Sequence, residues 1–108
     1  MSTDCLLVLC NTPDHACAEA IAQALVERRL AACVNILAPC HSVYRWQGAL
    51  EQTREVPLLI KTTTACYAAL ETAIREQHPY EVPEIIALPL NTGLPAYLGW
   101  IAQETTAA

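Results

Sequence analysis

The stretch from Leu30 to Thr63 constrains the fold of this chain more than any other part of it. It holds two apolar runs, Leu30–Ala38 and Val56–Ile60, and between them an alternating segment, His41–Gly48. Alternation of this kind is typical of a strand with one buried face. Gly48 and the polar residues 51–53 supply a turn region. The stretch therefore predicts a long antiparallel hairpin.

One face of this hairpin carries aromatic side chains. Alternation places Tyr44 and Trp46 together on one face of the strand, and Arg45 on the other. The chain is 54% hydrophobic and only 16% charged, below the roughly 25% of typical soluble proteins. A single domain over residues 1–108 is expected, and it has more apolar side chains than it can bury alone. We therefore expect an obligate oligomer, with Tyr44 and Trp46 at the interface.

Continuous apolar runs predict further strands, and apolar residues three and four positions apart predict helices. Thr12 is expected to cap the first helix, with Pro13 in its first turn. Pro39 predicts an interruption of the second strand. The expected strands are Cys5–Cys10, Ala32–Leu37, Glu55–Lys61 and Ile85–Leu90, and the expected helices span Thr12–Arg29, Thr64–Gln77 and Pro95–Gln103.

An internal repeat indicates how these elements are arranged. A shift of 52 positions places Leu6–Val8 on Leu58–Ile60, and Thr12 on Thr64. Two β-α-β halves joined by a hairpin form the ferredoxin-like βαββαβ pattern, an α+β fold with sheet order 4-1-3-2. The extended hairpin and a short C-terminal helix are additions to it. This topology brings Cys10, the connector from His78 to Glu84 and the base of the hairpin to one edge.

Cys10 and His78 form the candidate metal site. A thiolate and an imidazole suit a soft or borderline metal such as Cu or Zn, and Glu81 or Glu84 could add an oxygen ligand. The alternative is that Cys10 packs in the core and that His78 only ends a helix. Spacing alone favours this alternative, because two ligands from separate segments are a weak signal.

The sequence gives little support for an enzyme, a nucleotide-cofactor site or a nucleic-acid-binding protein. A Cys–His nucleophile needs an orienting third group and an oxyanion hole, and neither is indicated, so no catalytic residue is predicted. The carboxylates of Glu51, Glu55, Glu81 and Glu84 are interpreted as solvated. No nucleotide-cofactor motif is present, and the net charge of −5 without a basic cluster argues against nucleic acid.

A membrane-spanning segment would need roughly 18 apolar residues in a row, and no run approaches this length. The start of the chain, Met1–Cys5, has an acidic residue where a signal peptide would be positive. We therefore expect a cytoplasmic protein whose six cysteines are mostly reduced.

Several segments, in this order, resemble the CutA family of divalent-ion tolerance proteins, and the resemblance extends from Leu6 to Ile101. The segments are Glu27-Arg28, Leu30–Ile36 (LAACVNI), Ser42–Gly48 (SVYRWQG), Glu55, Ile60–Thr62 (IKT), His78–Ile85 (HPYEVPEI) and Tyr97–Ile101 (YLGWI).

The resemblance implies a ferredoxin-like fold, and a tight homotrimer in which hairpins and sheet edges pair between subunits. It implies a role in tolerance of divalent metal ions, no enzyme activity, and copper ligands at Cys10 and His78. Gln77 stands where some members of the family have a second His. The assembly is similar to that of PII signalling trimers. The alternative function is therefore a PII-like module that binds a small molecule or protein in clefts between subunits.

Overall fold

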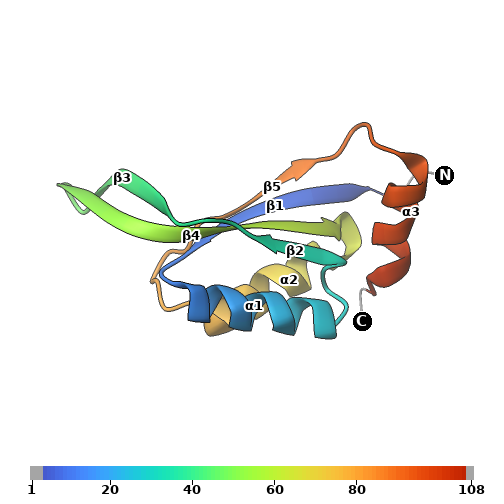
Figure 1. Cartoon of the computed structure of the whole chain (residues 1–108), viewed down its shortest axis with the longest axis horizontal. Coiled ribbons are helices and arrows are strands. Elements are labelled where there is room, and N and C mark those ends of the chain that lie inside the picture. The colour runs from blue at the N-terminus through green and yellow to red at the C-terminus, as the bar shows by residue number, and fades with distance from the viewer. Residues whose placement is uncertain (1–3, 107–108) are drawn as a thin grey trace.

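The structure is a computed structural model that describes residues 4–106 (Figure 1). The elements in chain order are β1 (Cys5–Thr12), α1 (His15–Glu27), β2 (Cys33–Ile36), β3 (Cys40–Trp46), β4 (Ala49–Thr63), α2 (Thr64–Gln77), β5 (Ile85–Pro89) and α3 (Pro95–Glu104). In the part of the chain that the structure describes, no helix is long and apolar enough to cross a membrane.

The sheet has the order β2-β4-β1-β5, and every neighbouring pair is antiparallel. β3 continues from β2 along the same partner, β4, after a break at residues 37–39 that includes Pro39. The two short strands together are the second strand of the predicted pattern, so the order agrees with the ferredoxin-like 4-1-3-2. Both α1 and α2 lie on one face of the sheet (Figure 1). The predicted α+β, ferredoxin-like fold is confirmed.

The hairpin of β3 and β4 extends beyond the body of the molecule (Figure 1). Its register runs from the Cys40–Glu55 pair to the Trp46–Ala49 pair. Gln47 and Gly48 form the turn, with positive φ angles of 50° and 82°, as a two-residue hairpin turn of type I′ requires. The turn is thus shorter than predicted: residues 51–53 belong to β4, because the pairing continues almost to the tip.

Asp14, and not Thr12, caps the first helix. The Asp14 carboxylate accepts a hydrogen bond from the Cys17 N–H at 2.8 Å. Thr12 is the last residue of β1, and its hydroxyl donates to the Val56 carbonyl at 2.8 Å. The prediction of Thr12 as the cap was wrong because the strand continues two residues beyond the apolar run Cys5–Cys10.

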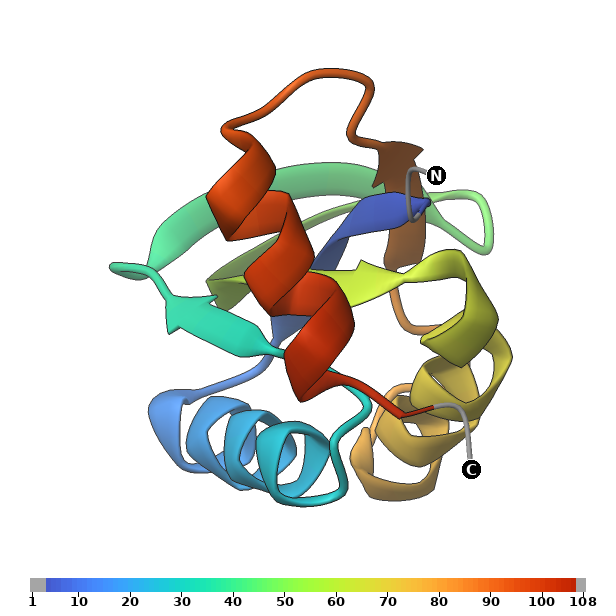
Figure 2. The same ribbon diagram turned by 90° about the vertical axis from the view of Figure 1, so that its right-hand side faces the viewer.

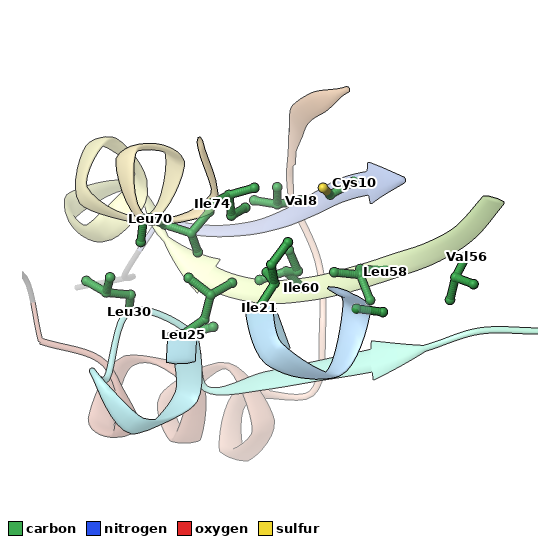
Figure 3. Close-up of a cluster of buried hydrophobic side chains, with 13 residues drawn as sticks. Val8, Cys10, Ile21, Leu25, Leu30, Val56, Leu58, Ile60, Leu70 and Ile74 are labelled. Carbon is green, nitrogen blue, oxygen red and sulfur yellow. The ribbon is translucent and has the colours of Figure 1, made fainter. Parts of the chain in front are cut away.

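The hydrophobic core lies between the sheet and the two helices. Figure 3 shows side chains from β1 and β4 meeting those of α1 and α2. Its fully buried members include Val8, Ile21, Leu25, Leu58, Ile60, Leu70 and Ile74. Cys10 belongs to the same cluster.

α3 crosses the end of the sheet away from the hairpin tip (Figure 2). Ile101 is its fully buried residue. Arg29, with a φ of 59° just after α1, bonds to the last turn of α3 and to the segment that follows it. Its carbonyl accepts from the Thr106 N–H at 2.8 Å, and its Nη2 donates to the Gln103 carbonyl at 3.1 Å.

Candidate functional site

The candidate site lies at the sheet edge where the hairpin leaves the body. In the register, Cys10 on β1 faces Leu58 on β4 and Ile85, the first residue of β5. Ile36, the last residue of β2, also faces Leu58. The end of β1, the connector before β5 and the base of the hairpin therefore meet at one edge, as the topology predicts.

The ring of His78 is held on both sides by backbone groups. His78 is the C-cap residue of α2 and is only 8% exposed. Its Nε2 lies 2.7 Å from the Asn11 carbonyl oxygen, and the Tyr80 N–H points to its Nδ1 at 3.2 Å. A carbonyl oxygen only accepts, so Nε2 carries the proton and Nδ1 is the acceptor. The two contacts thus fit one neutral tautomer, in which neither nitrogen is free for a metal.

Cys10 reaches the same carbonyl oxygen. Its side chain is 1% exposed, and its Sγ lies 3.8 Å from the Asn11 oxygen. Burial raises the pKa of the Cys10 thiol to about 12, and the nearby groups Glu84, Cys17 and Glu55 add to the rise. The structure therefore brings Cys10 and His78 together through Asn11, with the thiol protonated at neutral pH.

The predicted metal ligands do not form a complete site within one chain. Over residues 4–106, no group of three or more His, Cys, Asp or Glu side chains is placed to hold a metal ion. The Glu84 carboxylate, considered as an oxygen ligand, accepts instead from the Asn11 side-chain amide at 3.1 Å. Metal binding at Cys10 and His78 stays a prediction, and it needs further ligands from elsewhere.

Beside these residues lies a groove of about 680 Å³ between the hairpin and the connector. Tyr44 and Trp46 contribute to the hairpin side, and the connector contributes Tyr80 and Glu81. The full lining is Asn11, Ser42, Val43, Tyr44, Trp46, Glu55, Pro79, Tyr80, Glu81, Val82 and Glu84. Tyr44 and Trp46, predicted as interface residues, thus line a hollow in the single chain. Their role in assembly stays a prediction.

Glu55 is the functional candidate that the sequence interpretation missed. It is only 7% exposed, so its interpretation as a solvated carboxylate was wrong. The Tyr80 hydroxyl donates to Glu55 Oε2 at 3.1 Å. Burial, followed by this bond and the charge of Glu55, raises the pKa of Tyr80 to about 12, and Tyr44 and Cys17 add smaller contributions. One feature of the sequence could have indicated the burial of Glu55: it directly precedes the apolar run of β4.

Comparisons with known proteins agree on one family. The family model of the CutA1 divalent ion tolerance protein matches residues 6–104. The CutA of Thermus thermophilus is 48% identical over 99 residues, covering 92% of this chain and 96% of that protein. The CutA of Pectobacterium atrosepticum is 47% identical over 98 residues, covering 91% of this chain and 89% of that protein.

Comparison with solved structures indicates the same family. The Cut A1 structure from Thermus thermophilus superposes with a TM-score of 0.93 at 46% identity, covering 94% of this chain and 99% of that one. The CutA1 structure from Oryza sativa superposes with a TM-score of 0.94 at 34% identity, covering 99% and 98%. With the family model and these relatives in agreement over nearly all of its length, the chain belongs to the CutA family of divalent-cation tolerance proteins.

Proposed function

We propose that this protein acts in tolerance of divalent metal ions by binding copper at Cys10 and His78, as a homotrimer in the cytoplasm. One observation carries the metal site: Cys10 Sγ and His78 Nε2 meet at a single carbonyl oxygen, that of Asn11. Thiolate and imidazole are ligands that copper accepts readily. The names of these relatives refer to divalent-cation tolerance, which supports a role with metal ions.

Binding at this place has a defined chemical requirement. His78 must exchange one of its two hydrogen bonds for the metal, and Cys10 must release its proton, which a bound metal ion promotes. Further ligands must be water or groups of a second subunit, since the described residues supply no third donor. The proposal therefore ties the metal site to assembly.

Assembly is supported by apolar side chains that one chain leaves exposed. On the hairpin they are Val43, Tyr44, Trp46 and Leu50, and on the edge strand β5 they are Ile86 and Leu88. The radius of gyration, 14.4 Å, exceeds the roughly 13 Å expected for a compact chain of this length. A projecting hairpin with apolar residues and an uncovered sheet edge is what pairing between subunits would use.

We propose no catalytic step for this protein, and we place it in a reducing compartment. Burial keeps the Cys10 thiol protonated, and the His78 ring donates to a carbonyl rather than activating that thiol. All six cysteines are free in the structure, which supports the cytoplasm.

Titration of the purified protein with copper by isothermal titration calorimetry tests the site. Cys10→Ala and His78→Ala should each weaken binding by about tenfold or more, because even the outer-shell partners of metal ligands cost that much when they are mutated. His15→Ala and Cys33→Ala, which remove the same ligand types elsewhere, should bind as the wild type does. Unchanged affinity in both Cys10→Ala and His78→Ala would contradict the assignment.

A second candidate function is a PII-like module that binds a small molecule, and the groove of about 680 Å³ favours it. Its size falls in the range of small-molecule sites, roughly 300–1,000 Å³. A ligand that binds only the folded protein raises the melting temperature. A thermal-shift screen of nucleotides and small organic ions tests this function, and it fails if no compound shifts the melting temperature.

A further inference from the structure

Lys61, near the end of β4, is the only lysine of the chain. It is half-buried, and neither of the two ion pairs found within residues 4–106 involves it. Its Nζ donates instead to the side-chain oxygen of Asn35 on β2. The amine is therefore fixed on the sheet by a neutral group rather than by an ion pair.

Cys33, the first residue of β2, lies directly opposite Lys61 in the antiparallel register. Side chains of such opposite residues project from the same face of a sheet, with Cβ atoms about 4.5–5.5 Å apart. The Cys33 Sγ lies 3.9 Å from the same Asn35 oxygen that accepts from Lys61. The thiol and the amine therefore meet at one acceptor, on one face of the sheet.

The neighbours of Cys33 distinguish it from the other half-buried cysteines, Cys17 and Cys40. Burial, followed by the charge of Asp14, raises the pKa of the Cys17 thiol. Cys40 lies opposite the carboxylate of Glu55, whereas Cys33 lies opposite an amine. Oxidants select cysteines that they can reach and that have a cationic neighbour. Cys33 is thus the half-buried cysteine that we expect a peroxide to oxidise first.

The surroundings of the pair favour a reaction within the chain. Tyr97, on α3, is a neighbour of Cys33: burial, followed by the charge of Cys33 and a bond to it, raises the pKa of Tyr97. The side chains assigned to the subunit interface lie on the hairpin and on β5, whereas this pair joins β2 to the end of β4. A link between Cys33 and Lys61 needs no open pocket, because only the small oxidant must enter.

We propose that Cys33 and Lys61 are a redox modification site, at which a peroxide produces a reversible covalent link between sulfur and nitrogen. The Cys33 thiolate attacks one peroxide oxygen, the O–O bond breaks, and the sulfur becomes a sulfenic acid while hydroxide or alkoxide leaves. The neutral Lys61 amine then attacks this sulfur. The S–O bond breaks, and the hydroxyl group leaves as water with one proton of the amine.

The fold supplies what the second step needs. Holding the amine beside the sulfur makes that step intramolecular, so it competes well with further oxidation. A thiol reductant reverses the link by attacking the sulfur and releasing the amine, so the modification is transient in a reducing compartment. It goes beyond the proposed function and involves neither Cys10 nor His78.

Peptide mapping of the full-length protein after treatment with hydrogen peroxide tests the proposal. Free thiols are blocked, and the protein is digested with trypsin without reduction. Because trypsin does not cleave after a modified lysine, mass spectrometry should find peptide 30–45 joined to peptide 55–75. The pair should be lighter than the sum of its parts by about 2 Da, the two hydrogens that the oxidation removes. Dithiothreitol should separate it.

Variants at the two positions show which atoms are joined. Lys61→Arg keeps the positive charge but removes the amine, and Cys33→Ser removes the sulfur, so each should reduce the linked peptide to background. Cys40→Ser, the matched control within the same tryptic peptide, should form the link as the wild type does. Wild-type protein unfolded in urea should not form it, because the two residues are then no longer held together.

Three outcomes would overturn the proposal. One is an unlinked Lys61 in peroxide-treated wild-type protein whose Cys33 has become a sulfinic acid. Another is a disulfide from Cys33 to Cys66, which leaves trypsin free to cleave after Lys61 and yields peptide 62–75 in place of 55–75. The third is a linked peptide that persists in Lys61→Arg or in Cys33→Ser.

Discussion

Replacement of Trp46 by Ala tests the predicted interface in a quantitative way. Trp46 is 38% exposed in the single chain, so about 90 Å² of its side chain remains for a partner to cover. At about 25 cal/mol per Å², that surface contributes about 2 kcal/mol per chain, or about 6 kcal/mol per trimer. Because the midpoint concentration of a trimer varies as the square root of its dissociation constant, it should rise on the order of a hundredfold.

The assay is sedimentation velocity over a dilution series, with enough urea to bring the wild-type midpoint into range. Trp100→Ala is the matched control, since Trp100 is 39% exposed and lies on α3, at the other end of the molecule from the hairpin tip. It should leave the midpoint near the wild-type value. An unchanged midpoint in Trp46→Ala would refute the placement of this side chain between subunits.

Three further predictions concern the fold. Leu58→Ala removes a fully buried side chain and should lower the free energy of unfolding by about 2–5 kcal/mol in urea denaturation; a loss below this range would show that the core refills. Asp14→Ala removes the cap on the Cys17 N–H and should lower the free energy of unfolding by about 1 kcal/mol. No change in that free energy would show that water replaces the cap. The folded-state pKa of Tyr80, raised to about 12, means that the unfolded chain loses this proton first, so stability should fall as pH rises from about 10 to 12. Tyr80→Phe should make that fall shallower, and an equally steep fall would contradict this attribution.

The fold was predictable because its signals are local and repeated. Apolar runs marked β1, β4 and β5, and the repeat at 52 positions gave their order. Errors arose where two residues could serve the same purpose, as at Thr12 and Asp14, both good caps. The length of β4 was underestimated because its outer part is polar, and the register of an exposed hairpin depends on its turn rather than on burial.

The site was predictable only in part. Topology was enough to bring Cys10 and His78 to one edge of the sheet. The hydrogen bonds that occupy both ring nitrogens of His78 depend on the direction of the Asn11 carbonyl, which lies 67 residues away in sequence. The Tyr80 hydroxyl that donates to Glu55 likewise comes from a connector 25 residues further along the chain. Contacts of this kind follow from the assembled fold and leave no local pattern.

Native mass spectrometry of the copper-loaded protein tests the central claim most directly, because it reports assembly and metal content together. The account predicts a trimer that carries one copper ion per chain, and a Cys10→Ala protein that remains a trimer but loses the metal. A monomer, or a trimer that retains its copper without Cys10, would contradict it.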